Sequence, residues 1–185
     1  MAEEKGTLFW KCGAILLQGC VLSLTGEGFN VIQMFTSGIT GWRSTGSTMW
    51  QPLYLPPLAK AYGALGQFDN AWRCISEALI ATETTKESWC EVEVHRTAGE
   101  IALLSSDPDT ARAEAYFERA LAIARAQQAK SWELRAAMSM ARLWRDQGKR
   151  EEARELLAPV YAWFTEGFDT RDLKEAKALL NELAA

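Results

Sequence analysis

Three arginines in the second half of the chain have the side-chain type and the spacing to bind carboxylates. Arg135, Arg142 and Arg145 are seven and three residues apart, so a helix would carry all of them on one face. A guanidinium group is a rigid fork of N–H donors that can hold a carboxylate through two hydrogen bonds. This spacing predicts a surface that binds an acidic segment, and an ordinary solvated helix face would show the same pattern.

The other residues that could do chemistry favour structural roles. His95 is the only histidine, and its expected place on a helix that faces a partner helix predicts a structural imidazole with satisfied hydrogen bonds. A Ser/His/Asp arrangement lacks the nucleophile-elbow context. The glycine-rich stretch "SGITGWRSTGST" has neither the preceding strand nor the following lysine of a phosphate loop, which favours a connector. Most of the eight tryptophans are expected in the core, with Trp42, Trp50 and Trp132 left open.

Composition and charge indicate one globular domain in the cytoplasm. The 185 residues are 48% hydrophobic and 24% charged, and the net charge of −4 argues against binding to nucleic acid, which needs a concentrated basic face. The start "MAEEKG" is unlike a secretion signal, and the apolar run 13–24 is too short to span a membrane. Without a CxxC pair, the four cysteines are expected to be reduced, semi-buried residues: Cys12, Cys20, Cys74 and Cys90.

Residues of similar size recur along the chain at steps of 40 to 42 residues. One column holds small residues, Gly19, Ala59, Gly99 and Ala141. A second column holds small or β-branched residues, Val31, Ala71, Ala113 and Ala153, and a third holds large apolar residues, Phe35, Ile75, Phe117 and Leu157. Three columns in one register predict an internal repeat.

Each repeat is predicted to be a pair of antiparallel helices. The small residue lets the second helix approach closely, and the large residue fills the groove. Gly26, Gly66 and Gly148 are expected to end first helices in left-handed turns, whereas "SSDPDT" forms a longer loop in the third repeat. The expected repeats are 7–45, 49–85, 86–128 and 131–167 within a single domain 1–185, followed by a capping helix at 170–183. Pro56 and Pro57 predict that the helix near 49–65 starts late or kinks.

A family resemblance follows from these motifs. The stretch "LAKAYGALGQFDNAWRCISEAL" resembles a tetratricopeptide repeat, although the unit here is about six residues longer than the standard repeat of roughly 34. The stretch "AEAYFERALAIARAQQAKSWELRAAMSMARLWRDQGKREEARELL" resembles the carboxyl-terminal repeat region of large bacterial signalling proteins. In those proteins a class III nucleotide cyclase or a winged-helix DNA-binding domain is joined to a predicted ATPase and then to a repeat array.

The resemblance implies a fold and a function. The fold would be all-α, a right-handed superhelix of about four helix pairs with a capping helix. Because nothing in the chain resembles the catalytic parts, and no GxxxxGK[ST] loop is present, the resemblance implies a non-catalytic, cytoplasmic scaffold without a cofactor. Its partner would be an acidic segment of another protein or of a neighbouring signalling domain, with no role for nucleic acid or membrane. The alternative is a repeat domain that senses a small anionic ligand.

Tetratricopeptide arrays line their concave wall with first helices, at positions two, five, nine and twelve of each repeat. The resemblance places four residues from each of three repeats on this predicted inner wall. They are Leu53, Pro56, Lys60 and Gly63 in the second repeat, Glu93, Arg96, Glu100 and Leu103 in the third, and Arg135, Met138, Arg142 and Arg145 in the fourth. Its candidate partner-binding residues are Lys60, Glu93, Arg96, Glu100, Arg135, Met138, Arg142 and Arg145. Five basic and two acidic residues would give the wall three excess positive charges, unless Arg96 pairs with Glu100 one turn on and the others are solvated.

Overall fold

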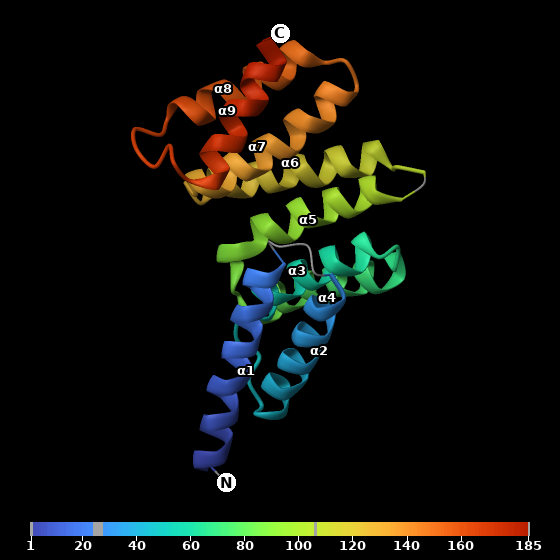
Figure 1. Cartoon of the computed structure of the whole chain (residues 1–185), viewed down its shortest axis with the longest axis vertical. Coiled ribbons are helices and arrows are strands. Elements are labelled where there is room, and N and C mark those ends of the chain that lie inside the picture. Colours follow the sequence, from blue (N-terminus) through green and yellow to red (C-terminus); the bar gives the residue numbers. More distant parts are fainter. Residues whose placement is uncertain (1, 24–27, 106, 185) are drawn as a thin grey trace.

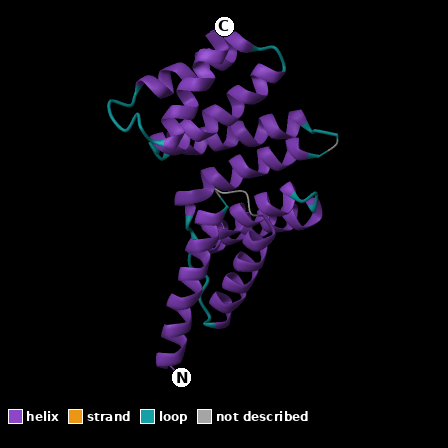
Figure 2. Cartoon of the chain, viewed as in Figure 1, coloured by secondary structure: helices purple, strands orange, loops and turns teal. Residues whose placement is uncertain are grey.

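The computed structural model describes residues 2–23, 28–105 and 107–184, and these residues form helices and turns without a strand (Figure 2). The helices are α1 (Ala2–Leu22), α2 (Gly28–Ser44), α3 (Gln51–Ala64), α4 (Phe68–Thr85), the 3-10 helix η1 (Ser88–Cys90), α5 (Glu91–Leu104), α6 (Thr110–Ala126), α7 (Lys130–Asp146), α8 (Arg150–Ala162) and α9 (Arg171–Ala184). The predicted all-α class is confirmed. Within these ranges no helix is both long and apolar enough to cross a lipid bilayer.

Consecutive helices pack as pairs: α1 with α2, α3 with α4, α5 with α6, and α7 with α8. The first helices of neighbouring pairs also touch, because α3 contacts α5 and α5 contacts α7. The last helix, α9, packs against both α8 and α7. Figure 1 shows the pairs following one another along the long axis, with α1 and α2 at one end and α7 to α9 at the other. This arrangement places the first helices side by side.

The helix expected near 49–65 contains both interior prolines. It begins at Gln51 and continues through Pro56 and Pro57, so these prolines do not delay its start, and the other predicted effect, a kink, stays a prediction. Pro52 lies in the first turn, where a helix needs no N–H donor. The two interior prolines remove ladder hydrogen bonds, and the burial of neighbours such as Leu58 offsets that loss.

Two of the predicted left-handed turns are confirmed. Gly66 and Gly148 follow α3 and α7 with φ of 72° and 81°, a conformation that residues with a Cβ rarely adopt. Gly26 lies outside the described residues. The third pair has no such glycine, and there Asp109 caps α6 by accepting a hydrogen bond from the Arg112 N–H at 2.9 Å.

All twelve residues of the three predicted columns are buried. Gly99 of α5 lies so close to Phe117 of α6 that a Cβ on Gly99 would be 2.4 Å from a ring carbon. A Cβ on Gly19 of α1 would likewise meet the Phe35 ring of α2 at 3.3 Å. In the first and third pairs the large residue therefore packs directly on the small one, as the sequence register predicts.

Gly99→Ala should destabilise the protein although alanine is the better helix former. Alanine gains about 1 kcal/mol in helix propensity, whereas forcing a methyl group against the Phe117 ring costs roughly 1 to 3 kcal/mol. Thermal melts should show a lower midpoint for this variant. Gly6→Ala is the matched control, because a Cβ there meets nothing within 4 Å, and it should leave the midpoint unchanged or raise it. Equal midpoints for the two variants would contradict the packing.

Candidate functional site

A ladder of polar contacts crosses the side-by-side first helices. Lys60 of α3 donates to Glu100 of α5 at 2.9 Å, and Arg96 of α5 donates to the Ser139 hydroxyl of α7 at 3.3 Å. Ser139 also lies 3.5 Å from Glu100. Predicted inner-wall residues of the second and third repeats therefore meet each other, and they reach α7 through Ser139, which the sequence did not single out.

Arg96 is the most enclosed charge of this ladder, with a side chain only 12% exposed. It binds Glu93 through two N–H groups, at 2.7 and 2.5 Å, and it also pairs with Glu100. Burial alone would lower the pKa of Arg96, but the hydrogen bonds and charges of Glu93 and Glu100 outweigh it and raise the pKa. For Glu100, burial alone would raise the pKa, but the charges of Arg96 and Lys60 outweigh burial, so the pKa of Glu100 is lowered. The pairing of Arg96 with Glu100, which the sequence left open as the alternative to a free basic wall, is present in the structure.

The three arginines of α7 each meet a carboxylate of α9. The contacts are Arg135 Nε to Asp172 Oδ2 at 2.6 Å, Arg142 Nη2 to Glu175 Oε2 at 3.0 Å, and Arg145 Nη1 to Glu182 Oε2 at 2.8 Å. The sequence analysis missed these acidic residues because it ended the inner wall at the fourth repeat. The signal was present: extending the register of first helices into 170–183 places a helix with carboxylates at 172, 175 and 182 next to α7.

This pairing corrects the predicted charge of the wall. Three carboxylates from α9 offset the expected excess of three positive charges. The arginine side chains remain 41%, 39% and 31% exposed, for Arg135, Arg142 and Arg145, so water reaches them. Exposed ion pairs of this kind contribute no more than about 1 kcal/mol each. The α7 arginines are therefore oriented by α9 but are not locked into it.

In two of the three ion pairs between α7 and α9, one residue also binds an oppositely charged residue of its own helix. Arg145 also donates to Asp146 at 2.9 Å, and Asp146 is the largest cause of the raised pKa of Arg145. Glu175 also accepts from Arg171 at 2.7 Å, and Arg171 is the largest cause of the lowered pKa of Glu175. Arg145 and Glu175 would thus keep a partner if α7 and α9 separated.

Met138 does not belong to this surface. Its side chain is 3% exposed and packs in the core cluster around α7. The position lies only three residues from Arg135, but α7 contacts α5, α6, α8 and α9, so most of its circumference faces other helices. We therefore leave Met138 out of the candidate partner-binding residues.

His95 differs in part from the expected satisfied histidine. Its Nε2 lies 3.6 Å from a Glu91 carboxylate oxygen, but its buried Nδ1 has no hydrogen-bond partner among the described residues. The ring lies near Tyr116 of α6, with ring centres 6.0 Å apart. Burial lowers the pKa of His95, with a smaller lowering from the Arg119 charge, and both outweigh the opposing effect of Glu91.

The lowered pKa of His95 predicts that stability falls on mild acidification. The unfolded chain binds a proton on His95 near pH 6.5, whereas the folded chain binds it only at lower pH. The free energy of unfolding should therefore decrease as the pH falls through about 6.5 and stop decreasing, for this group, below the folded pKa. Urea melts of the parent and of His95→Gln between about pH 7.5 and 5.5 would check this, since the chain has no other histidine. Equal slopes for both proteins would contradict it.

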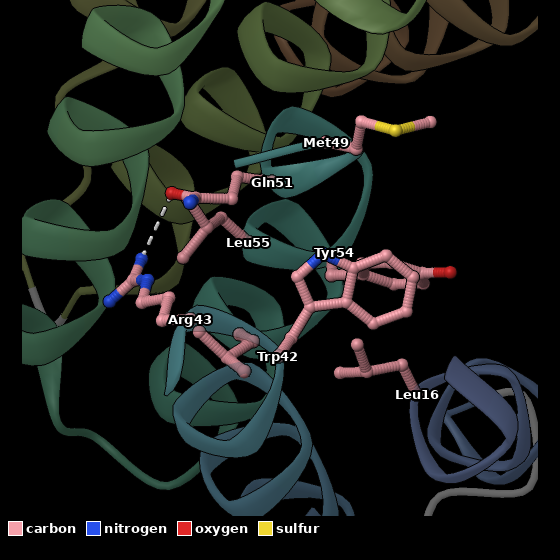
Figure 3. A pocket seen from close by; sticks show the side chains of 8 residues that line it. Leu16, Trp42, Arg43, Met49, Gln51, Tyr54 and Leu55 are labelled. Atoms are coloured by element: carbon pink, nitrogen blue, oxygen red, sulfur yellow. Dashed lines mark hydrogen bonds between the residues drawn. The ribbon is translucent and has the colours of Figure 1, made fainter. Parts of the chain in front are cut away.

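The structure holds an enclosed apolar pocket and an open cleft. The pocket lies between α1, α2 and α3 and has a free volume of about 10 Å³, close to the space of one water molecule. Figure 3 shows Trp42 and Tyr54 in its lining and the hydrogen bond from Arg43 to Gln51 at 3.2 Å. The cleft, of about 420 Å³, is lined by Ser88, Trp89, Gln127, Ala129 and Trp132.

The tryptophans are less buried than the sequence analysis expects. Trp42, which it left open, is 2% exposed and is the most buried of the eight. Trp10, Trp89 and Trp163 are 70%, 45% and 58% exposed, so they are not core residues. The position of a tryptophan within a helix does not show whether another helix covers its side chain, so burial of these three tryptophans was predicted wrongly.

The cysteines match the prediction of unpaired, semi-buried side chains. All four are free, and only Cys20 is not fully buried. Burial raises the pKa of the Cys74 thiol to about 11 and that of Cys90 to about 12. Thiols with such values are not thiolates at neutral pH and are poor nucleophiles.

No protein-family model matches the chain, and no curated protein is significantly similar to it. The candidate site therefore stands on its own geometry: a polar surface across α3, α5 and α7 whose arginines hold the carboxylates of an amphipathic helix.

Proposed function

We propose that the chain is a non-catalytic, tetratricopeptide-like scaffold of a bacterial signalling system, acting in the cytoplasm. Its helix pairs would form a right-handed superhelix that α9 caps. The surface formed by α3, α5 and α7 would hold an acidic segment of another protein or of a neighbouring signalling domain. The close tetratricopeptide spacings of the second repeat and the side-by-side first helices support this proposal.

The contact of α7 with α9 is the observation that carries the proposal. A helix with carboxylates at three positions already meets Arg135, Arg142 and Arg145 at hydrogen-bond distances. The α7 face is therefore compatible, in spacing and in charge, with an acidic helix. The alternative, a sensor of a small anionic ligand, fits less well for two reasons. The pocket beside Trp42 has a free volume of only about 10 Å³, and the open cleft of about 420 Å³ has no lysine or arginine among the residues that line it.

Peptides of matched shape and different charge test this function. The probes are amphipathic peptides of about 18 residues with one Leu/Ala face and with Glu, Gln or Lys on the polar face, a length of roughly five helical turns. The parent should bind the Glu peptide most tightly, and raising the salt from about 50 to 500 mM should weaken that binding.

The variant Arg135→Gln/Arg142→Gln/Arg145→Gln should lose the preference for the Glu peptide, because glutamine keeps helix propensity and removes the charge. Arg73→Gln/Arg119→Gln/Arg154→Gln removes three exposed arginines of second helices and should keep the preference. The proposed site is refuted if the variant without the three α7 arginines still prefers the Glu peptide. It is also refuted if the parent does not prefer the Glu peptide.

A further inference from the structure

The last helix of the described chain, α9, follows α8 through a connector and packs on two helices of the fourth pair. Residues 163–170 connect α9 to α8, and α9 then lies against α7 and α8 at the end of the stack (Figure 1). Its apolar side is buried in the same core cluster as the interior of α7 and consists of Leu173, Ala176, Leu179 and Leu183. Its contact with the repeats combines this apolar stripe, the row of charges that meets α7, and a hydrogen bond from Arg150 of α8 to the Glu182 carbonyl.

Acidic and apolar residues of α9 occur in a fixed order. Each carboxylate that meets an α7 arginine immediately precedes a buried apolar residue: Asp172 before Leu173, Glu175 before Ala176, and Glu182 before Leu183. The arginines and carboxylates pair in ascending order along both helices, so α7 and α9 run parallel. The α7 face thus fits a helix with acidic residues at i, i+3 and i+10 and apolar residues at i+1, i+4, i+7 and i+11.

Separation of α9 from α7 would leave two of the six paired charges with an ionic partner. Arg145 retains Asp146, and Glu175 retains Arg171, because each of these contacts lies within one helix. The Asp172 and Glu182 side chains are already 30% and 58% exposed, so they are partly hydrated while docked. A second helix of the same chemistry would restore every contact that α9 gives up.

We propose that the partner's acidic segment is an amphipathic helix with the pattern of α9, and that it binds by replacing α9 on the α7 face. This inference rests on the proposed function and specifies its ligand: charge complementarity to Arg135, Arg142 and Arg145, and an apolar stripe in the place of Leu173, Ala176, Leu179 and Leu183. In the free chain α9 occupies this docking surface. The partner competes with it.

The test uses a labelled synthetic peptide of residues 169–184 and the full-length chain. In the parent, the tethered α9 is present at high effective concentration and should keep the peptide's affinity low. The variant Glu175→Lys/Glu182→Lys places lysines against Arg142 and Arg145, weakens the docking of α9, and should bind the peptide at least about tenfold more tightly. Glu151→Lys/Glu155→Lys makes the same charge change on exposed residues of α8 and should behave like the parent.

A peptide with Asp172→Lys, Glu175→Lys and Glu182→Lys should not bind any of these proteins. Hydrogen exchange of the parent gives a readout that needs no variant: excess unlabelled peptide should speed exchange of the α9 amides. The replacement is overturned if the α9 variant binds the peptide no better than the α8 control, or if the α9 amides stay protected at saturating peptide. If Glu peptides still bind the parent through the α7 arginines in that case, the scaffold function stands and only the replacement of α9 is refuted.

Discussion

The close approach of the two helices in each pair is the constraint on which the rest of this structure depends. Phe117 can lie against α5 because position 99 has no side chain, and Phe35 lies against Gly19 in the same way. A methyl group at Gly99 would enter the Phe117 ring, so this contact fixes both the separation and the rotation of α5 and α6. The same columns are buried in all four pairs, so each pair places its column residues in the core.

That geometry decides which side chains meet between the pairs. Once the rotation of each first helix is fixed, α3, α5 and α7 present one side to each other, and Lys60, Glu100, Arg96 and Ser139 form a continuous polar ladder. Next to α7, where the first helix of a fifth pair would lie, the structure has α9, and its carboxylates meet the α7 arginines. The charged surface is thus a consequence of the packing columns, and a change in the columns would alter it.

The sequence predicted the helices and their packing columns because both arise from local periodicity and residue size. The spacing of four residues also indicated the Arg96–Glu100 pair as an alternative to a free basic wall, because both residues lie on one helix. It did not predict that Asp172 and Glu175 would meet Arg135 and Arg142, because those contacts depend on how α9 is rotated against α7. The burial of Met138 and of Trp42 was missed for a related reason: the number of helices around each position is a property of the whole stack.

The most direct measurement of the central claim, that the α7 arginines and the α9 carboxylates contribute to the docking of α9 beside its buried apolar stripe, is amide hydrogen exchange in charge-reversed chains. One variant reverses the α7 charges and carries Arg135→Glu, Arg142→Glu and Arg145→Glu. A second variant reverses the α9 charges and carries Asp172→Arg, Glu175→Arg and Glu182→Arg. Each variant should exchange its α9 amides faster than the parent. The chain that carries all six changes should regain the slow exchange of the parent, because the pairs re-form with their signs exchanged. If the chain with all six changes exchanges as fast as either one-sided variant, or if neither one-sided variant differs from the parent, the arginines of α7 do not hold α9 in place.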